Sequence, residues 1–240
     1  MRPALRAEWA KLRTVPDAAL ALPLIALLTA AVSVAASTAS SPDVVRSSLL
    51  GVQLGQAAVA IWAVQMLAGE YGSGLIRATF TALPRRLDVL LAKAALLLAG
   101  VFAAAVPAIV VSVLAGHGLS PGYPGLGTGM VVSAAGGSVL YLCLIALLGL
   151  GVAAMSRSAV AATGIVLGVL LAPTVLTMFV NPDWQRWIYR LSPSTAGQTI
   201  QSTVDTAALP IGAWAGLGVA AAWAFAALGA GAVTLCLRDV

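Results

Sequence analysis

The sequence contains few charged residues for its length. Asp, Glu, Lys and Arg make up 9% of the 240 residues, whereas soluble proteins carry about 25%. So small a set of charged side chains cannot cover the surface of a protein in water, and 60% of the residues are hydrophobic. The composition therefore predicts an integral membrane protein. Its net charge of +5 is explained by the Lys and Arg excess of cytoplasmic loops, and no nucleic-acid partner is expected.

Residues that build catalytic and metal sites are also scarce. The only histidine is His117, and the two cysteines, Cys143 and Cys236, both lie in apolar runs. A multi-histidine metal site or a disulfide framework needs more ligands than these. A membrane-embedded enzyme would need a polar catalytic cluster, and the sequence shows none. We therefore expect no metal site, no catalytic residue and no enzymatic activity in this chain.

Long apolar stretches dominate what is present. An α-helix needs about 20 apolar residues to cross the hydrocarbon layer, and six stretches meet this requirement. They are continuous, unlike the short segments of alternating polarity that form membrane β-barrels. We predict an all-α integral membrane protein in which residues 1–240 form a single transmembrane domain. The predicted spans are residues 18–39, 49–68, 94–114, 130–155, 159–180 and 213–235.

The first predicted span could also be a cleaved signal peptide, because "VAASTASS" contains small residues suited to cleavage. However, the segment before it is long and contains two acidic residues, Glu8 and Asp17. The apolar run also exceeds the roughly 7–15 residues of a signal-peptide core. We therefore favour an uncleaved first span.

Basic residues are unevenly distributed between the predicted spans. Most of them fall in one set of loops: Arg2, Arg6, Lys11, Arg13, Arg77, Arg85, Arg86, Lys93, Arg157 and Arg238. The alternate loops contain Arg46, Arg186 and Arg190. Because cytoplasmic loops carry the excess of Lys and Arg, both termini are predicted to be cytoplasmic. The preference for Ala, Gly, Val and Arg over Ile, Asn and Lys favours a GC-rich bacterium, and hence a bacterial plasma membrane.

Two segments are predicted to be short helices in the membrane interface. Residues 5–12 place Trp9 among leucines and basic residues, with Lys11 and Arg13 close by, as in an interfacial helix on the inner side. On the outer side, "DWQRWIYRL" places Trp184 and Trp187 on one face of a helix and arginines on the other. Both segments are expected to anchor the protein to lipid.

The segment "GEYGSGLIRATFTALPRR", residues 69–86, is polar and basic between two apolar spans. At 100° per residue, its apolar side chains between residues 73 and 83 fall in an arc of about 140°. This pattern predicts a short amphipathic helix that begins after an N-cap at Ser73 and ends before Pro84. Two interpretations stay open: a helix resting in the lipid headgroups, or a docking surface for a cytoplasmic protein.

The same segment resembles the cytoplasmic signature of bacterial ABC transporter permeases of the type-2 class. The residues that match are Glu70, Tyr71, Gly74, Arg77 and Pro84. The leader "LRAEWAKLRTVP" is similar to the N-terminal helix of that family, and "YRLSPSTAGQTI" is similar to its element before the last span. The resemblance extends over the whole chain, with six spans and three motifs in the same order.

The resemblance implies a half-transporter that exports a hydrophobic or amphiphilic cargo, such as a drug, a peptide or a lipid. Two copies would pair with two P-loop ATPase subunits that bind ATP and Mg²⁺, and this chain would hold no cofactor. The segment after the second span would then be the coupling helix. Its candidate residues are Glu70, Tyr71, Gly74, Leu75, Ile76, Arg77, Phe80, Pro84, Arg85 and Arg86. The sequence contains no GxxxxGK[ST] run, so ATP hydrolysis is expected in the partner.

Polar residues within the spans leave further alternatives open. Gln53 and Gln56 lie one turn apart in the second span, where they can form helix–helix hydrogen bonds or line a substrate route. No acidic residue lies in the middle of a span, which disfavours an ion-coupled carrier. The alternative function is a membrane anchor or regulatory subunit that binds an ATPase and transports nothing.

Overall fold

The computed structural model describes residues 2–14, 16–82, 86–204, 206 and 209–237. Within these ranges the regular elements are helices and no strand occurs. Six of the helices are long and apolar enough to cross a membrane, which confirms the predicted number of spans. They are α2 (Pro16–Ser37), α4 (Gly51–Gly72), α6 (Arg86–Leu119), α7 (Gly129–Ser156), α8 (Ala159–Leu176) and α11 (Ala213–Leu237).

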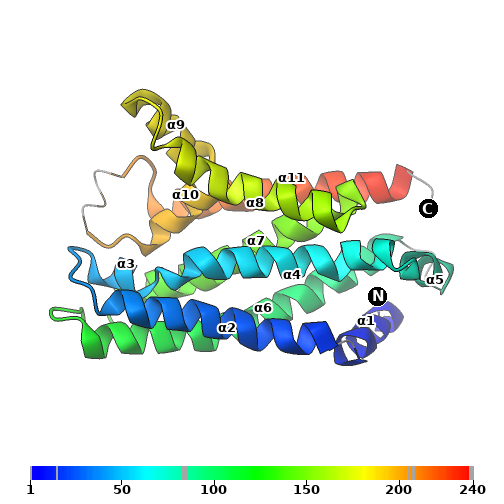
Figure 1. The fold of residues 1–240 in the computed structure, drawn as a ribbon, viewed down its shortest axis with the longest axis horizontal. Helices are drawn as coiled ribbons and strands as arrows, with labels where there is room; N and C mark the ends of the chain where they lie inside the picture. Colours follow the sequence, from blue (N-terminus) through cyan, green and yellow to red (C-terminus); the bar gives the residue numbers. More distant parts are fainter. Residues whose placement is uncertain (1, 15, 83–85, 205, 207–208, 238–240) are drawn as a thin grey trace.

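Shorter helices lie at the two ends of this bundle (Figure 1). They are α1 (Arg2–Thr14), α3 (Val44–Ser48), α5 (Leu75–Ala82), α9 (Pro182–Leu191), α10 (Pro193–Gly197) and the 3₁₀ helix η1 (Gln198–Gln201). Helices α1 and α5 lie at one end, together with the start and the finish of the chain, and this end is termed the inner end. Helices α3, α9 and α10 lie at the opposite end, termed the outer end. The names follow the predicted orientation.

Helix α7 is the central helix of the bundle. It packs against α4, α6, α8 and α11, and most of its length is buried inside the protein. This position explains why its sequence is apolar on every side, since a helix that meets no water needs no polar face. Helix α8, by contrast, is mostly exposed. Its exposed side chains are also apolar apart from Thr174, as expected where a helix faces lipid.

Glycines allow two helix pairs to approach closely. A Cβ at Gly51 of α4 would lie 1.8 Å from the carbonyl oxygen of Thr29 on α2, and a Cβ at Gly151 of α7 would lie 2.4 Å from the backbone of Ala227 on α11. Small residues therefore bring these backbones into contact, as in many membrane helix pairs. Gly164 and Gly168 on α8 differ, because a Cβ there would meet no atom within 4 Å.

The segment around α5 differs from the sequence prediction at its start. Ser73 ends α4 rather than beginning α5, and its hydroxyl donates a hydrogen bond of 2.9 Å to the carbonyl oxygen of Gly69. Gly74 follows with a φ of +73°, a left-handed conformation that glycine adopts readily. The chain turns at this residue, and α5 begins at Leu75.

Helix α6 is longer than the predicted third span. The sequence places Lys93 in a loop before an apolar run that starts at residue 94, whereas α6 is already helical from Arg86. Lysine is a good helix former, so the helix continues through this residue, and its charge is paired inside the protein.

Candidate functional site

Four charged side chains meet at the inner end of the bundle, and together they are termed the inner cluster. They are Glu8 and Lys11 of α1, Glu70 of α4 and Lys93 of α6. The Lys93 ammonium lies 2.6 Å from Glu8 Oε2 and 2.6 Å from Glu70 Oε1. The Lys11 ammonium lies 2.9 Å from Glu8 Oε1 and 2.9 Å from Glu70 Oε1. Two cations thus share two carboxylates, and three helices are joined at one point.

The centre of the inner cluster is removed from solvent. Lys93 is 1% exposed and Glu8 is 2% exposed. A single charge at this depth would cost several kcal/mol, so each ion needs a partner of opposite charge. Lys93 also donates a hydrogen bond of 3.1 Å to the carbonyl oxygen of Met66. Its three N–H donors therefore all have acceptors.

Lys11 lies at the edge of the inner cluster and remains partly exposed. Burial disfavours its charged form, but hydrogen bonds and charges from Glu8 and Glu70 outweigh that effect and raise the pKa of Lys11 above 10.5. The Lys11 ammonium is therefore a stable cation at physiological pH.

The inner cluster extends to α5 through a threonine. The Lys11 ammonium donates a hydrogen bond of 3.0 Å to Thr79 Oγ1, and the Thr79 hydroxyl donates one of 3.1 Å to the carbonyl oxygen of Leu75. Ile76 and Thr79 are buried, whereas Leu75 is 57% exposed. Helix α5 is thus fixed to the bundle through Ile76 and Thr79, and Leu75, its first residue, is exposed.

The remaining predicted coupling residues are only partly visible. Pro84 and Arg85 lie outside the described residues, and so do the side chains of Arg77 and Phe80. Gly74 forms the turn before α5.

Tyr71, at the end of α4, contacts the turn between α7 and α8. The guanidinium carbon of Arg157 lies 5.8 Å from the centre of the Tyr71 ring, in a cation–π arrangement. Arg157 has a φ of 55°, which is unusual for a residue with a side chain. The end of α4 is therefore linked to the α7–α8 turn as well as to the inner cluster.

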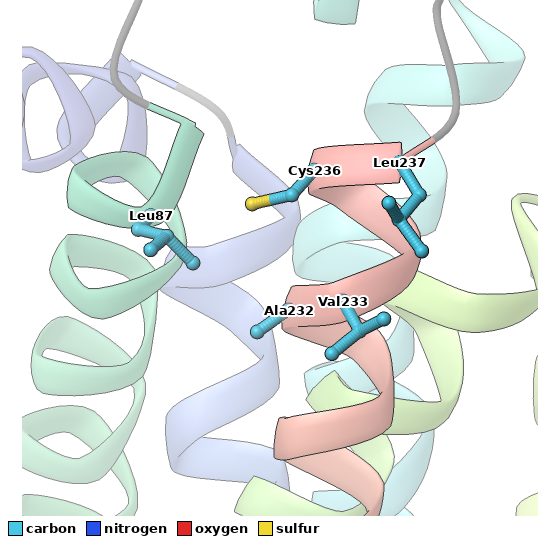
Figure 2. Close-up of a pocket in the computed structure, with 5 residues that line it drawn as sticks. All are labelled: Leu87, Ala232, Val233, Cys236 and Leu237. Atoms are coloured by element: carbon cyan, nitrogen blue, oxygen red, sulfur yellow. The ribbon is translucent and has the colours of Figure 1, made fainter.

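Arg86 joins the start of α6 to the last turn of α11. Its Nη1 donates a hydrogen bond of 2.7 Å to the carbonyl oxygen of Leu235, where a cation is favoured by the helix dipole. Beside this contact is an apolar crevice of about 280 Å³, where Cys236 points toward Leu87 (Figure 2).

The predicted interfacial anchors lie on exposed surfaces, with one exception. Trp9 on α1 and Trp184 and Trp187 on α9 are all more than half exposed. Lys11 instead belongs to the inner cluster. The side chain of Arg13 lies outside the described residues.

The two glutamines of α4 lie in different surroundings. Gln53 is exposed, whereas Gln56 is buried. The amide oxygen of Gln56 accepts hydrogen bonds from the Tyr141 hydroxyl of α7 and, at 3.2 Å, from Gln198 Nε2 of η1. Gln56 therefore links three helices in the outer half of the bundle, and the structure does not bring the two glutamines to one surface.

Sequence reasoning missed the partners of Glu70. From the sequence, Glu8 is only a charge in the leader, and Lys93 is only a charge in a loop, next to the apolar run that starts at residue 94. Because Lys and Arg commonly border membrane spans in cytoplasmic loops, the sequence gives no signal that Lys93 is buried. Which carboxylates it meets depends on the packing of α1, α4 and α6.

Neither protein-family models nor curated proteins give a match to this sequence. Within the described residues, no group of three or more His, Cys, Asp or Glu side chains could hold a metal ion.

Proposed function

We propose that the chain is the membrane-spanning subunit of an ATP-driven exporter in a bacterial plasma membrane. It moves a hydrophobic or amphiphilic cargo outward, and a separate P-loop ATPase hydrolyses the ATP. The observation that carries this proposal is the way α5 is attached. A single buried ionic cluster joins α5 to α1, α4 and α6, while Leu75 at the start of α5 is exposed.

This attachment favours a docking helix over a helix that only rests in lipid headgroups. Helix α5 has 8 residues, and an isolated helix of that length is unstable in water. Its contact with Lys11 through Thr79 fixes it to charges that cannot separate without a large loss of stability. A force applied to α5 is therefore passed on to two spans, α4 and α6.

The complex would contain two copies of this chain and two ATPase subunits. Glu70 is a candidate coupling residue by its motif, but its carboxylate is bound inside the inner cluster and is not offered to the ATPase. In this proposal Glu70 transmits movement from α5 to the spans, and Leu75 contacts the ATPase.

Purification in mild detergent followed by reconstitution tests the proposal. We expect a P-loop ATPase and two copies of this chain in the purified complex, with ATP-dependent movement of an amphiphilic dye in vesicles. Leu75→Asp should abolish ATPase recovery, because it places a charge in the contact. An aspartate at Leu20, on the exposed side of α2, would lie in lipid and cannot serve as a control. The matched pair is therefore Leu75→Ala and Leu20→Ala.

The outcomes separate the alternatives. Recovery of the ATPase without movement of any amphiphile in vesicles would favour a regulatory or anchoring subunit. Absence of any P-loop ATPase from the purified complex would contradict both functions.

A further inference from the structure

An apolar groove lies at the outer end of the bundle between α8, α9 and α11. Its volume is about 430 Å³, within the roughly 300–1,000 Å³ of small-molecule sites. Its lining is almost entirely apolar and includes Gly168, Ala172 and Leu176 of α8, Trp187 and Ile188 of α9, and Trp223 of α11. The groove belongs to neither the inner cluster nor α5.

Helix α9 forms one wall of the groove without closing it. No residue of α9 is buried. Hydrogen bonds hold the helix to α8 and α11: Gln185 Nε2 donates to the carbonyl oxygen of Thr177 at 2.6 Å, and Trp223 Nε1 donates to the carbonyl oxygen of Leu191 at 2.9 Å. The apolar side of α9 therefore rests over a space that the described protein leaves unfilled.

The opposite side of α9 is basic. Arg186 and Arg190 are both exposed, and Asp183 is the acidic residue beside them. Asp183 lies 3.4 Å from Arg186, and both side chains are mostly exposed, so this pair is weak. Arg190 Nε donates to the carbonyl oxygen of Pro210 at 2.7 Å. Because a guanidinium has five N–H donors, both arginines retain donors for an anion.

Together these features match one class of ligand. The groove suits a hydrocarbon chain, and tryptophans at its rim are typical of the depth at which lipid headgroups lie. Two arginines at that depth suit a phosphate. We propose that the groove binds one acyl chain of an anionic phospholipid whose phosphate lies beside Arg186 and Arg190. The bound lipid completes the contact of α9 with α8 and α11. This proposal requires only that the chain spans a membrane, and it does not depend on export.

Tryptophan fluorescence of the full-length protein tests the proposal, because Trp187 and Trp223 line the groove. The purified protein in detergent is titrated with phosphatidylglycerol or phosphatidylcholine carrying a brominated acyl chain, which quenches nearby tryptophans. We expect saturable quenching by phosphatidylglycerol. Phosphatidylcholine should need about thirtyfold more lipid, since each of the two basic residues contributes about 1 kcal/mol near an anionic lipid. Arg186→Gln should reduce this preference, and Arg46→Gln on α3 should not.

Two glycines of α8 give a matched pair of variants for the groove itself. A Cβ at Gly168 or at Gly164 meets no atom within 4 Å, so both positions accept a larger side chain. Gly168 lines the groove and Gly164, one turn away, does not. We expect Gly168→Phe to weaken saturable quenching by about tenfold, a change of about 1.4 kcal/mol in binding. Gly164→Phe should bind lipid like the wild type.

Several results would overturn the proposal. Equal quenching by the two lipids would show that the arginines do not bind the lipid phosphate. Equal lipid quenching in the two glycine variants would show that the lipid does not bind in the groove. Size-exclusion chromatography is run on every sample. If Gly168→Phe splits a dimer and lipid quenching is absent, a second copy of the chain covers the groove instead.

Discussion

At the scale of single residues, Lys93 shows most clearly how charge is stabilised in this protein. Its ammonium is buried in α6 and bound by carboxylates from α1 and α4. Those carboxylates are held in turn by Lys11. Removing one ion from such a group leaves the others without full compensation, which is far more costly than losing an exposed pair.

Lys93→Met is therefore expected to lower stability by about 3 kcal/mol or more. Arg6→Met is the matched control, because Arg6 is an exposed basic residue of α1. Thermal unfolding in detergent measures the difference. Adding Glu8→Gln to Lys93→Met should recover part of the loss, since Glu8 and Glu70 would otherwise share Lys11 as their one remaining cation in the inner cluster. Equal stability of the Lys93 and Arg6 variants would contradict the inner cluster.

Asp43 gives a pH-dependent prediction at the outer end. Burial disfavours its charged form, but hydrogen bonds from the backbone of Arg46, from the backbone and hydroxyl of Thr203 and from the backbone of Val204 outweigh burial and lower its pKa below 3.8. A pKa lower in the folded state than in the unfolded state stabilises the fold at neutral pH, and this stabilisation is lost as the pH falls through the folded value. Residues 203 and 204 should therefore detach from α3 in acid.

Amide hydrogen exchange at Thr203 and Val204, whose N–H groups donate to Asp43, measures this detachment. The protection of these two amides, relative to their intrinsic exchange rates, should fall below pH of about 4. With Asp43→Asn, the carboxylate is absent at every pH, so protection should be low throughout and lack the acid step. An identical acid step in both proteins would show that another group is responsible.

At the scale of elements, the short helices depend on contacts more than on their own sequences. Helix α5 is held by the buried side chains of Ile76 and Thr79 and by the Lys11 hydrogen bond. Because α5 is too short to be stable alone, loss of one such contact should loosen the whole helix.

Thr79→Val tests this dependence, because valine has a similar shape but cannot accept the Lys11 hydrogen bond. A loss of about 1 kcal/mol should speed amide hydrogen exchange in residues 75–82 about fivefold and leave α7 unchanged. Thr174→Val on the exposed side of α8 is the control. Unchanged exchange in α5 would mean that Lys11 does not hold it.

The elements also show what the sequence could and could not predict. Long apolar runs determine the six spans, because only helices satisfy backbone polar groups in lipid. The start of α6 could not be predicted from the apolar run, because that run marks only the part suited to lipid, and the burial of Lys93 depends on Glu8, which lies far away in the sequence. The role of Ser73 was misjudged for a similar reason: a serine hydroxyl can serve either end of a helix, and the turn at Gly74 decides which.

At the scale of the whole molecule, the buried α7 is one of six long apolar helices, and the others are more exposed. The start and the finish of the chain lie at the same end of this bundle (Figure 1). The inner cluster and α5 are at that end as well. The uneven distribution of basic residues predicts that this end is cytoplasmic. The proposed function requires this orientation, because the ATPase that contacts α5 would need the ATP of the cytoplasm.

Cysteine labelling in intact cells tests the orientation, with Cys143 and Cys236 replaced by alanine. A cysteine at Leu75, which is exposed on α5, should react with a membrane-impermeant maleimide only after the cells are opened. A cysteine at Val204, which is exposed at the outer end, should react in intact cells. Reaction of both from the same side would contradict the arrangement.

Crosslinking from α5 tests the central claim most directly. A photoreactive phenylalanine analogue replaces Leu75 in living cells, and the same analogue at Leu20 on the exposed side of α2 is the control. After irradiation, we predict that a P-loop ATPase is joined to residue 75 and not to residue 20. Crosslinks from residue 75 to lipid alone would contradict the claim that α5 is the contact with an ATPase.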